Sequence, residues 1–98
     1  TDVETNPGQI PAEFSLSQNY PNPFNPSTMF TYQVARAGLV SVKVYDVLGR
    51  EVATLTNEVR QAGTYSATWN ASGFGSGIYL CKLQAGSFTE TKKLILMK

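Results

Sequence analysis

The chain has 98 residues, 42% of them hydrophobic and 15% charged, a composition too apolar for intrinsic disorder and a length that suits one domain rather than two. Eight Lys and Arg against seven Asp and Glu leave a net charge of +1, so no strong field exists to attract nucleic acid or an anionic membrane. His is absent and Cys occurs once, at Cys81, which excludes Ser-His-Asp and Cys-His catalytic systems, His-containing zinc sites and an intrachain disulfide.

The first residues have the composition of a linker. Residues 1–13 are polar and acidic, contain two prolines and follow neither the strand period nor the helix period. They lack the basic start and apolar core of a signal peptide, and no apolar run in the chain approaches the roughly 18 residues of a membrane span. We therefore expect a flexible linker from an upstream domain over 1–13, a folded domain over 14–98 and no insertion into a membrane.

A stiff loop follows a short extended segment that begins at Phe14. Residues 20–27 contain three prolines and two asparagines. Each proline fixes its own φ and restricts the residue before it, and asparagine side chains bond readily to local backbone. We expect Tyr20 and Phe24 in this loop to cap one end of a hydrophobic core.

The rest of the chain reads as strands separated by turns. Apolar and polar residues alternate along several segments, no segment sustains a helical period, and Gly-containing or polar stretches separate the segments. Trp69 and Tyr79 fall in phase with the apolar residues of their segments, so we expect both in one core. The alternation predicts strands near 29–34, 40–45, 51–56, 64–69, 78–83 and 88–97.

About seven strands, each with one apolar face, favour two antiparallel sheets packed face to face. We predict an immunoglobulin-like antiparallel β-sandwich. Tyr79 precedes Cys81 by two residues, which is the spacing of a corner tyrosine and the second disulfide cysteine in immunoglobulin domains. Because no first cysteine exists, we expect Gly77 to make a sharp entry into the strand and Tyr79 to pack in the core with its hydroxyl bonded to nearby backbone. Cys81 is expected to be a small, inert, buried side chain.

Several motifs together resemble the type A C-terminal sorting domain of the type IX secretion system. The resemblance implies a small β-sandwich that directs an upstream cargo through an outer-membrane translocon, via the periplasm, to the cell surface or the medium, and that a surface peptidase then removes. Thr56 and Cys81 depart from the family, which more often has apolar residues at both places. The motifs are 14–28 (FSLSQNYPNPFNPST), 44–55 (VYDVLGREVATL), 62–65 (AGTY) with Trp69, 76–79 (SGIY) and 92–98 (KKLILMK).

The last motif places four apolar residues between lysines. Lys92, Lys93 and Lys98 could simply guard an aggregation-prone sheet edge. Alternatively, a receptor could recognise a free charged edge by adding a strand of its own to the sheet. The resemblance favours this second interpretation. The candidate recognition residues are therefore Gly77, Tyr79, Lys92, Lys93 and Lys98, and the expected partners are the translocon and its peptidase, with the domain itself a monomer.

Three other functions remain open at this point. The Ig-like domain of flagellar hook-capping proteins shares the Asn-Pro-Phe-Asn-Pro and Tyr-Asp-x-x-Gly-Arg motifs. A carbohydrate-binding module would need exposed aromatics, for which Tyr45 and Phe74 are the candidates, although an aromatic in a loop is more often a lid on the core.

An enzyme is the third alternative, and it would have to combine Asp46, Glu51 or Glu58 with Tyr79 or Lys43. These carboxylates are more typical of turn and surface residues. We expect no catalytic residue, no metal site and no cofactor.

Overall fold

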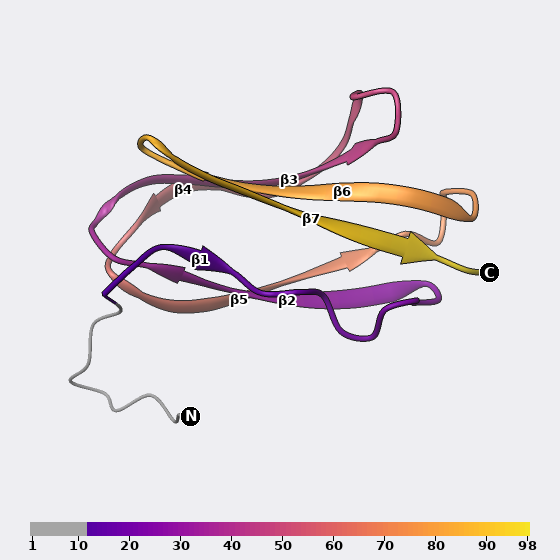
Figure 1. The fold of residues 1–98 in the computed structure, drawn as a ribbon, viewed down its shortest axis with the longest axis horizontal. Helices are drawn as coiled ribbons and strands as arrows, with labels where there is room; N and C mark the ends of the chain where they lie inside the picture. Colours follow the sequence, from indigo (N-terminus) through magenta and orange to yellow (C-terminus); the bar gives the residue numbers. More distant parts are fainter. Residues whose placement is uncertain (1–11) are drawn as a thin grey trace.

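A computed structural model of the chain describes residues 12–98, so the first 11 residues of the predicted linker lie outside the described residues. The described chain is all-β and forms two antiparallel sheets that pack face to face (Figure 1). One sheet has the strand order β1-β2-β5 and the other the order β4-β3-β6-β7. This confirms the predicted immunoglobulin-like β-sandwich. The strands are β1 (Ser15–Leu16), β2 (Ser27–Val34), β3 (Gly38–Asp46), β4 (Glu51–Arg60), β5 (Gly63–Asn70), β6 (Gly77–Ala85) and β7 (Phe88–Leu96).

The alternation of apolar and polar residues decides which side chains enter the core, because successive side chains of a strand point to opposite faces. Both sheets turn their apolar faces toward each other. Trp69 is 3% exposed and Tyr79 9% exposed in the same cluster, which confirms their predicted place in one core. The fully buried large residues are Tyr32, Phe30, Leu83, Leu94, Leu96, Val34, Val40, Val42, Val44 and Cys81.

The β4 strand is longer than the sequence pattern suggested. It continues past Thr56 to Arg60 because its polar second half pairs with β3 as far as Gly38. The β3–β4 register shifts twice, between Val42 and Lys43 and again between Val44 and Tyr45. Such shifts bend an edge strand and interrupt its pairing surface.

The expectation for Tyr20 is wrong, whereas that for Phe24 is confirmed. Phe24 is 2% exposed, but Tyr20 is 78% exposed. Tyr20 forms an isolated antiparallel bridge with Met29, and bridged residues place their side chains on the same face of a sheet. Met29 points outward and is 47% exposed, so the bridge carries the tyrosine ring to the solvent face.

The two long sides of the sandwich differ. On one side β1 contacts β7, and on the other side β4 contacts β5, to which it is joined by residues 61–62 (Figure 1). The chain ends beside β7, and the β5–β6 loop lies at the same end of the sandwich (Figure 1). The predicted recognition residues on β6 and β7 are therefore held near one corner or along one edge of the larger sheet.

Candidate recognition site

Four aromatic rings fill the core beneath the C-terminal corner. The Trp69 ring lies 5.8 Å from Phe24, 5.4 Å from Phe74 and 5.3 Å from Tyr79, measured between ring centroids. The Tyr79 hydroxyl donates a 2.7 Å hydrogen bond to the carbonyl oxygen of Gly75, as the sequence predicted. Phe74 is half-buried and packs on this cluster as a lid, with its ring 6.2 Å from that of Tyr79. The cluster fixes the β5–β6 loop against the core.

The β5–β6 loop also holds the end of the chain. The Lys98 backbone N–H donates to the Ser76 hydroxyl at 2.9 Å, and the Lys98 ammonium donates to the carbonyl oxygen of Ser72 at 2.6 Å. Gly77, which starts β6 beside these contacts, has a φ of +152°, a value that residues with a Cβ rarely adopt. Gly77, Tyr79 and Lys98 therefore belong to one structural corner.

The outer edge of β7 is bonded to the proline-rich loop. The Phe24 N–H donates to the carbonyl oxygen of Ile95 at 2.9 Å, and the Phe24 carbonyl accepts the N–H of Met97 at 3.0 Å. Between them, the Asn22 side-chain oxygen accepts the N–H of Ile95 at 3.0 Å. This segment of the loop thus replaces a neighbouring strand along the last third of β7.

Two further bonds attach β1 and the segment that follows it to β7. The Gln18 side-chain amide donates to the carbonyl oxygen of Lys93 at 2.8 Å, and the Leu16 N–H donates to the Glu90 carboxylate at 2.9 Å. The β7 edge is therefore not free along its whole length, as the sequence led us to expect: distant residues bond to its backbone from the Lys93 carbonyl to the Met97 N–H. The sequence indicated that asparagines in the loop bond to backbone, but carried no signal for the strand that they reach.

The three C-terminal lysines do not form one charged patch. Lys92 lies in the inward register and pairs with Glu90 at 3.3 Å. Lys93 faces outward and is exposed, and within the described residues no side-chain partner of its ammonium group is found. Lys98 is bonded to the loop through Ser72. Their side chains thus have three different roles, and Lys93 is the one most available for an external contact.

The charged residues are distributed unevenly over the two sheets. No charged residue lies on β1, β2 or β5. The outer face of the larger sheet instead carries Lys43 directly opposite Lys82. Lys93 lies on the next strand, β7, two residues after Thr91, the register partner of Lys82. Like charges directly opposite one another destabilise a sheet, and Lys43 is relieved by an ion pair with Glu51 at 3.5 Å.

The β3–β4 turn is fixed by one carboxylate. Asp46 accepts the N–H groups of Leu48 and Arg50 at 2.9 and 3.0 Å and the Arg50 guanidinium at 2.8 Å. The hydrogen bond from the Arg50 N–H, supported by the guanidinium and the Leu48 N–H, lowers the pKa of Asp46 below its ordinary value. Gly49 supplies the positive φ of +85° that the turn requires. Asp46 is thereby explained as a turn residue.

The other carboxylates considered as acid or base also have local partners. Glu51 accepts a hydrogen bond from the Thr54 hydroxyl, which together with Lys43 lowers the pKa of Glu51. Glu58 pairs with Arg60 at 2.9 Å. Among residues 12–98, no group of His, Cys, Asp and Glu is arranged to hold a metal ion. The same part of the chain contains no helix with the length and hydropathy of a membrane span.

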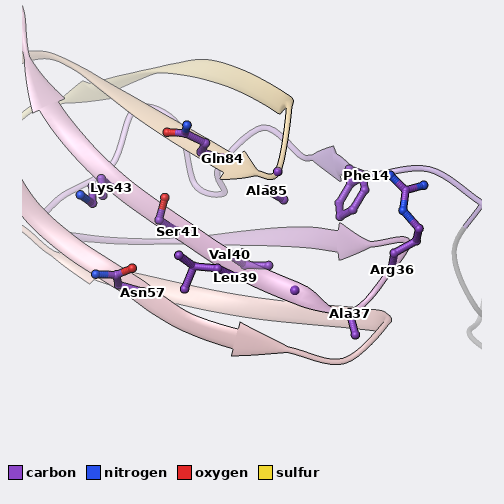
Figure 2. A pocket seen from close by; sticks show the side chains of 12 residues that line it. Phe14, Arg36, Ala37, Leu39, Val40, Ser41, Lys43, Asn57, Gln84 and Ala85 are labelled. Atoms are coloured by element: carbon purple, nitrogen blue, oxygen red, sulfur yellow. The ribbon is translucent and has the colours of Figure 1, made fainter.

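A shallow hollow of about 500 Å³ lies on the outer side of β3, away from the C-terminal corner (Figure 2). Arg36 and Phe14 form one end, with the guanidinium carbon 5.5 Å from the ring centroid, and Lys43 lies toward the other end (Figure 2). Ser41 and Gln84 are spread between them along two strands. None of the predicted recognition residues lines the hollow.

The two residues that depart from the resembled family both face the core. Cys81 is fully buried, and burial raises the pKa of its thiol to about 12. Thr56 is 6% exposed, and its hydroxyl lies 3.4 Å from that of Tyr32, close enough for a long hydrogen bond. The polar atom of Thr56 is thus partnered inside the sandwich.

The sequence motifs agree with a comparison to known families. Residues 18–97 match the family model described as "Secretion system C-terminal sorting domain". The chain belongs to this family. Membership implies a role as a type IX secretion sorting signal, carried by the same chain as its cargo, and export to the cell surface or the medium.

The match favours the sorting domain over the hook-capping and carbohydrate-binding alternatives. Membership of a sorting-signal family favours a non-catalytic role. No curated protein matches the chain.

Proposed function

We propose that this domain directs an upstream cargo through the outer-membrane translocon of the type IX system and that a surface peptidase then separates it from the cargo. The family match over 18–97 carries this proposal. The cargo crosses the periplasm and the outer membrane and ends in the medium or on the surface. The domain acts as a monomer, with the translocon, the peptidase and the cargo as its partners, and it uses no cofactor and neither binds nucleic acid nor inserts into the membrane.

We further propose that the translocon recognises the folded domain rather than an extended tail. The support is the attachment of β7, whose outer edge is bonded through Asn22 and Phe24. A linear tail would have to break these bonds before it could be read. A folded surface is available without that cost.

In this proposal the five candidate residues divide into three groups. Gly77, Tyr79 and Lys98 position the β5–β6 loop and the end of the chain, because their contacts are internal to the domain. Lys92 holds Glu90, the carboxylate that accepts the Leu16 N–H. Lys93 makes the external contact, since its ammonium group is exposed on the outer face.

A reporter fusion tests the function. The reporter carries an export signal at its start and this chain at its end, and is expressed in a host with the type IX system and in an otherwise identical host without the translocon. We expect the reporter in the medium or on the surface only in the first host, and shortened by about the mass of the domain. Accumulation of the fusion inside both hosts would contradict the proposal.

Lys93→Glu tests the recognition site, with Lys82→Glu as its matched control. Both lysines face outward on neighbouring strands, and Lys82 pairs with Thr91, two residues before Lys93. We expect both variants to fold, because Lys93 is exposed and Lys82, although half-buried, lies on the outer face, and surface substitutions usually change stability by no more than about 0.5 kcal/mol. Export should fall for Lys93→Glu alone. Equal export of the two variants would mean that Lys93 only guards the strand.

A further inference from the structure

A β-sandwich of two open sheets has four edge strands, and edges attract the strands of other chains unless they are blocked. Three edges of this domain are short, partly covered or interrupted. β1 has only two residues. The last third of β7 is bonded to the segment that contains Asn22 and Phe24. β4 has two register shifts and carries Glu58 and Arg60 in its second half. The fourth edge, that of β5, has none of these features.

The hydrogen-bond pattern shows which β5 groups are open. In an antiparallel pair, alternate residues direct both backbone groups toward the partner strand. The Ala71 N–H bonds to the carbonyl oxygen of Pro26, which continues the β2–β5 register. The odd-numbered residues of β5 therefore bond to β2. The N–H and C=O groups of Thr64, Ser66 and Thr68 point the other way, and no backbone group in residues 12–98 pairs with them.

The pairing of β2 gives the same result from its other side. Met29 exchanges backbone bonds with Tyr20, and the carbonyl oxygen of Thr31 accepts the N–H of Ser17. The odd-numbered residues of β2 thus face β1, and its even-numbered residues face β5. Phe30 pairs with Ala67 and Thr28 with Trp69, so the odd-numbered residues of β5 are again the ones bonded inside the sheet.

The side chains near this edge indicate what an added strand would contain. On the outer face it would lie beside Thr64, Ser66 and Thr68, which are exposed and uncharged. On the inner face it would lie beside the half-buried Tyr65 and Ala67.

The neighbouring edge strand, β4, leaves Val52 and Leu55 half-buried as well. An added strand of alternating apolar and uncharged polar residues would meet no charge on β5. On the inner face it would pack beside Tyr65, whose ring is already partly covered by the Arg60 guanidinium of β4, 5.0 Å from the ring centroid.

We propose that the β5 edge receives an extended segment of the export machinery by strand addition, with apolar residues alternating with uncharged polar ones. This inference rests on the proposed sorting function. The new strand runs beside Thr64, Ser66 and Thr68 and takes up their backbone groups. It extends the smaller sheet on the side away from β7, so the β7 corner with Lys93 stays accessible.

Two pairs of variants separate the backbone edge from the surface around it. Ser66→Pro removes an outward N–H without touching the bonds to β2, a position where edge strands tolerate proline, and Ser66→Ala keeps that N–H. Ser66→Lys adds a charge at the edge, and Thr31→Lys adds the same charge one strand inward, because Thr31 is the register partner of Ser66. Each is placed in the reporter fusion, and the thermal unfolding of each isolated chain is measured.

We expect Ser66→Ala and Thr31→Lys to be exported like the parent, and Ser66→Pro and Ser66→Lys to fold but to lose at least tenfold in export. If Ser66→Pro does not fold, the two lysine variants decide. Export of the folded edge variants within twofold of their controls overturns the inference and leaves the sorting function intact. Failure of the parent fusion itself overturns the sorting function. A parent that self-associates in sedimentation, with monomeric edge variants, identifies a second copy as the occupant and also overturns the inference.

Discussion

Asn22 and Ile95, 73 positions apart in the chain, are joined by a hydrogen bond of 3.0 Å from the Ile95 N–H to the Asn22 side-chain oxygen. Phe24 bonds to the same stretch through its own backbone, to the carbonyl of Ile95 and the N–H of Met97. A proline-rich loop near the start of the domain therefore takes the place of a neighbouring strand along the last third of β7. The loop is stiff enough to hold this position because its prolines restrict the backbone.

Asn22→Ala should expose the Ile95 N–H at the sheet edge. We expect a loss of roughly 0.5 to 1.5 kcal/mol in the free energy of unfolding, the net value of one hydrogen bond, and faster amide exchange at Ile95. Asn25→Ala is the matched control, since Asn25 lies in the same loop and is exposed. Equal exchange at Ile95 in the two variants would show that the Asn22 bond does not protect the edge.

Trp69→Ala should remove the ring that contacts three other aromatics. We expect a destabilisation of about 3 to 5 kcal/mol, as for other truncations of large buried rings, measured by denaturant unfolding. Thr68→Ala changes the exposed neighbour on the same strand and should be nearly neutral. An unchanged denaturant midpoint for Trp69→Ala would mean that the phase of β5 is wrong.

The sequence was sufficient for the sandwich because strand phase is a local property. Alternation placed Trp69 and Tyr79 in the core. Because the chain has no second cysteine, the Tyr79–Cys81 spacing was correctly attributed to packing and not to a disulfide. The prediction that Tyr20 is buried was wrong because the direction of its side chain depends on a bridge to Met29, a contact set by tertiary structure. Proline content alone could not indicate which face the ring would take.

The roles of the candidate recognition residues could be predicted only in part from the sequence. Lysines around an apolar strand look alike in a sequence, but Lys92 faces Glu90, Lys98 reaches Ser72, and Lys93 is left exposed. The pairing of Leu16 with Glu90 is equally invisible in the sequence, because it joins the first strand to the last one. Long-range contacts of this kind have no periodic signal.

The stability of the domain should fall in acid partly through Asp46. Hydrogen bonds from Arg50 and Leu48 lower its pKa in the folded state below the ordinary value of 3.8, so the folded state favours the carboxylate. This contribution is present above the pKa of the unfolded chain and is lost as the pH falls through the lower folded value. Unfolding midpoints from pH 6 to pH 2 should therefore fall less steeply for Asp46→Asn than for the parent. Parallel profiles would contradict the role of the carboxylate.

Cys81 should not react in the folded protein. Burial raises its pKa to about 12, so the thiolate that would attack an alkylating reagent is scarce at pH 8. We expect iodoacetamide to modify Cys81 only after denaturant unfolds the chain, with the extent followed by mass spectrometry. Rapid modification under native conditions would show that the β6 interior opens readily.

Limited proteolysis tests the domain boundary. Phe14 is the first aromatic that packs, with its ring 5.6 Å from that of Phe88. We expect the first cuts within residues 1–13, and mass spectrometry should then find a resistant fragment that begins near Phe14. A first cut between Phe14 and Met97 would refute the boundary at residue 14.

The bonds between β7 and the segment from Leu16 to Phe24 have a consequence for biosynthesis. Ribosomes make the proline-rich loop early and β7 late, so the loop has no strand to bind until Ile95 and Met97 have been made. A chain that ends before β7 leaves the loop without its hydrogen-bond partners. The folded domain therefore forms only after translation has passed through β7, and under the proposed sorting function the cargo becomes competent for export from that point.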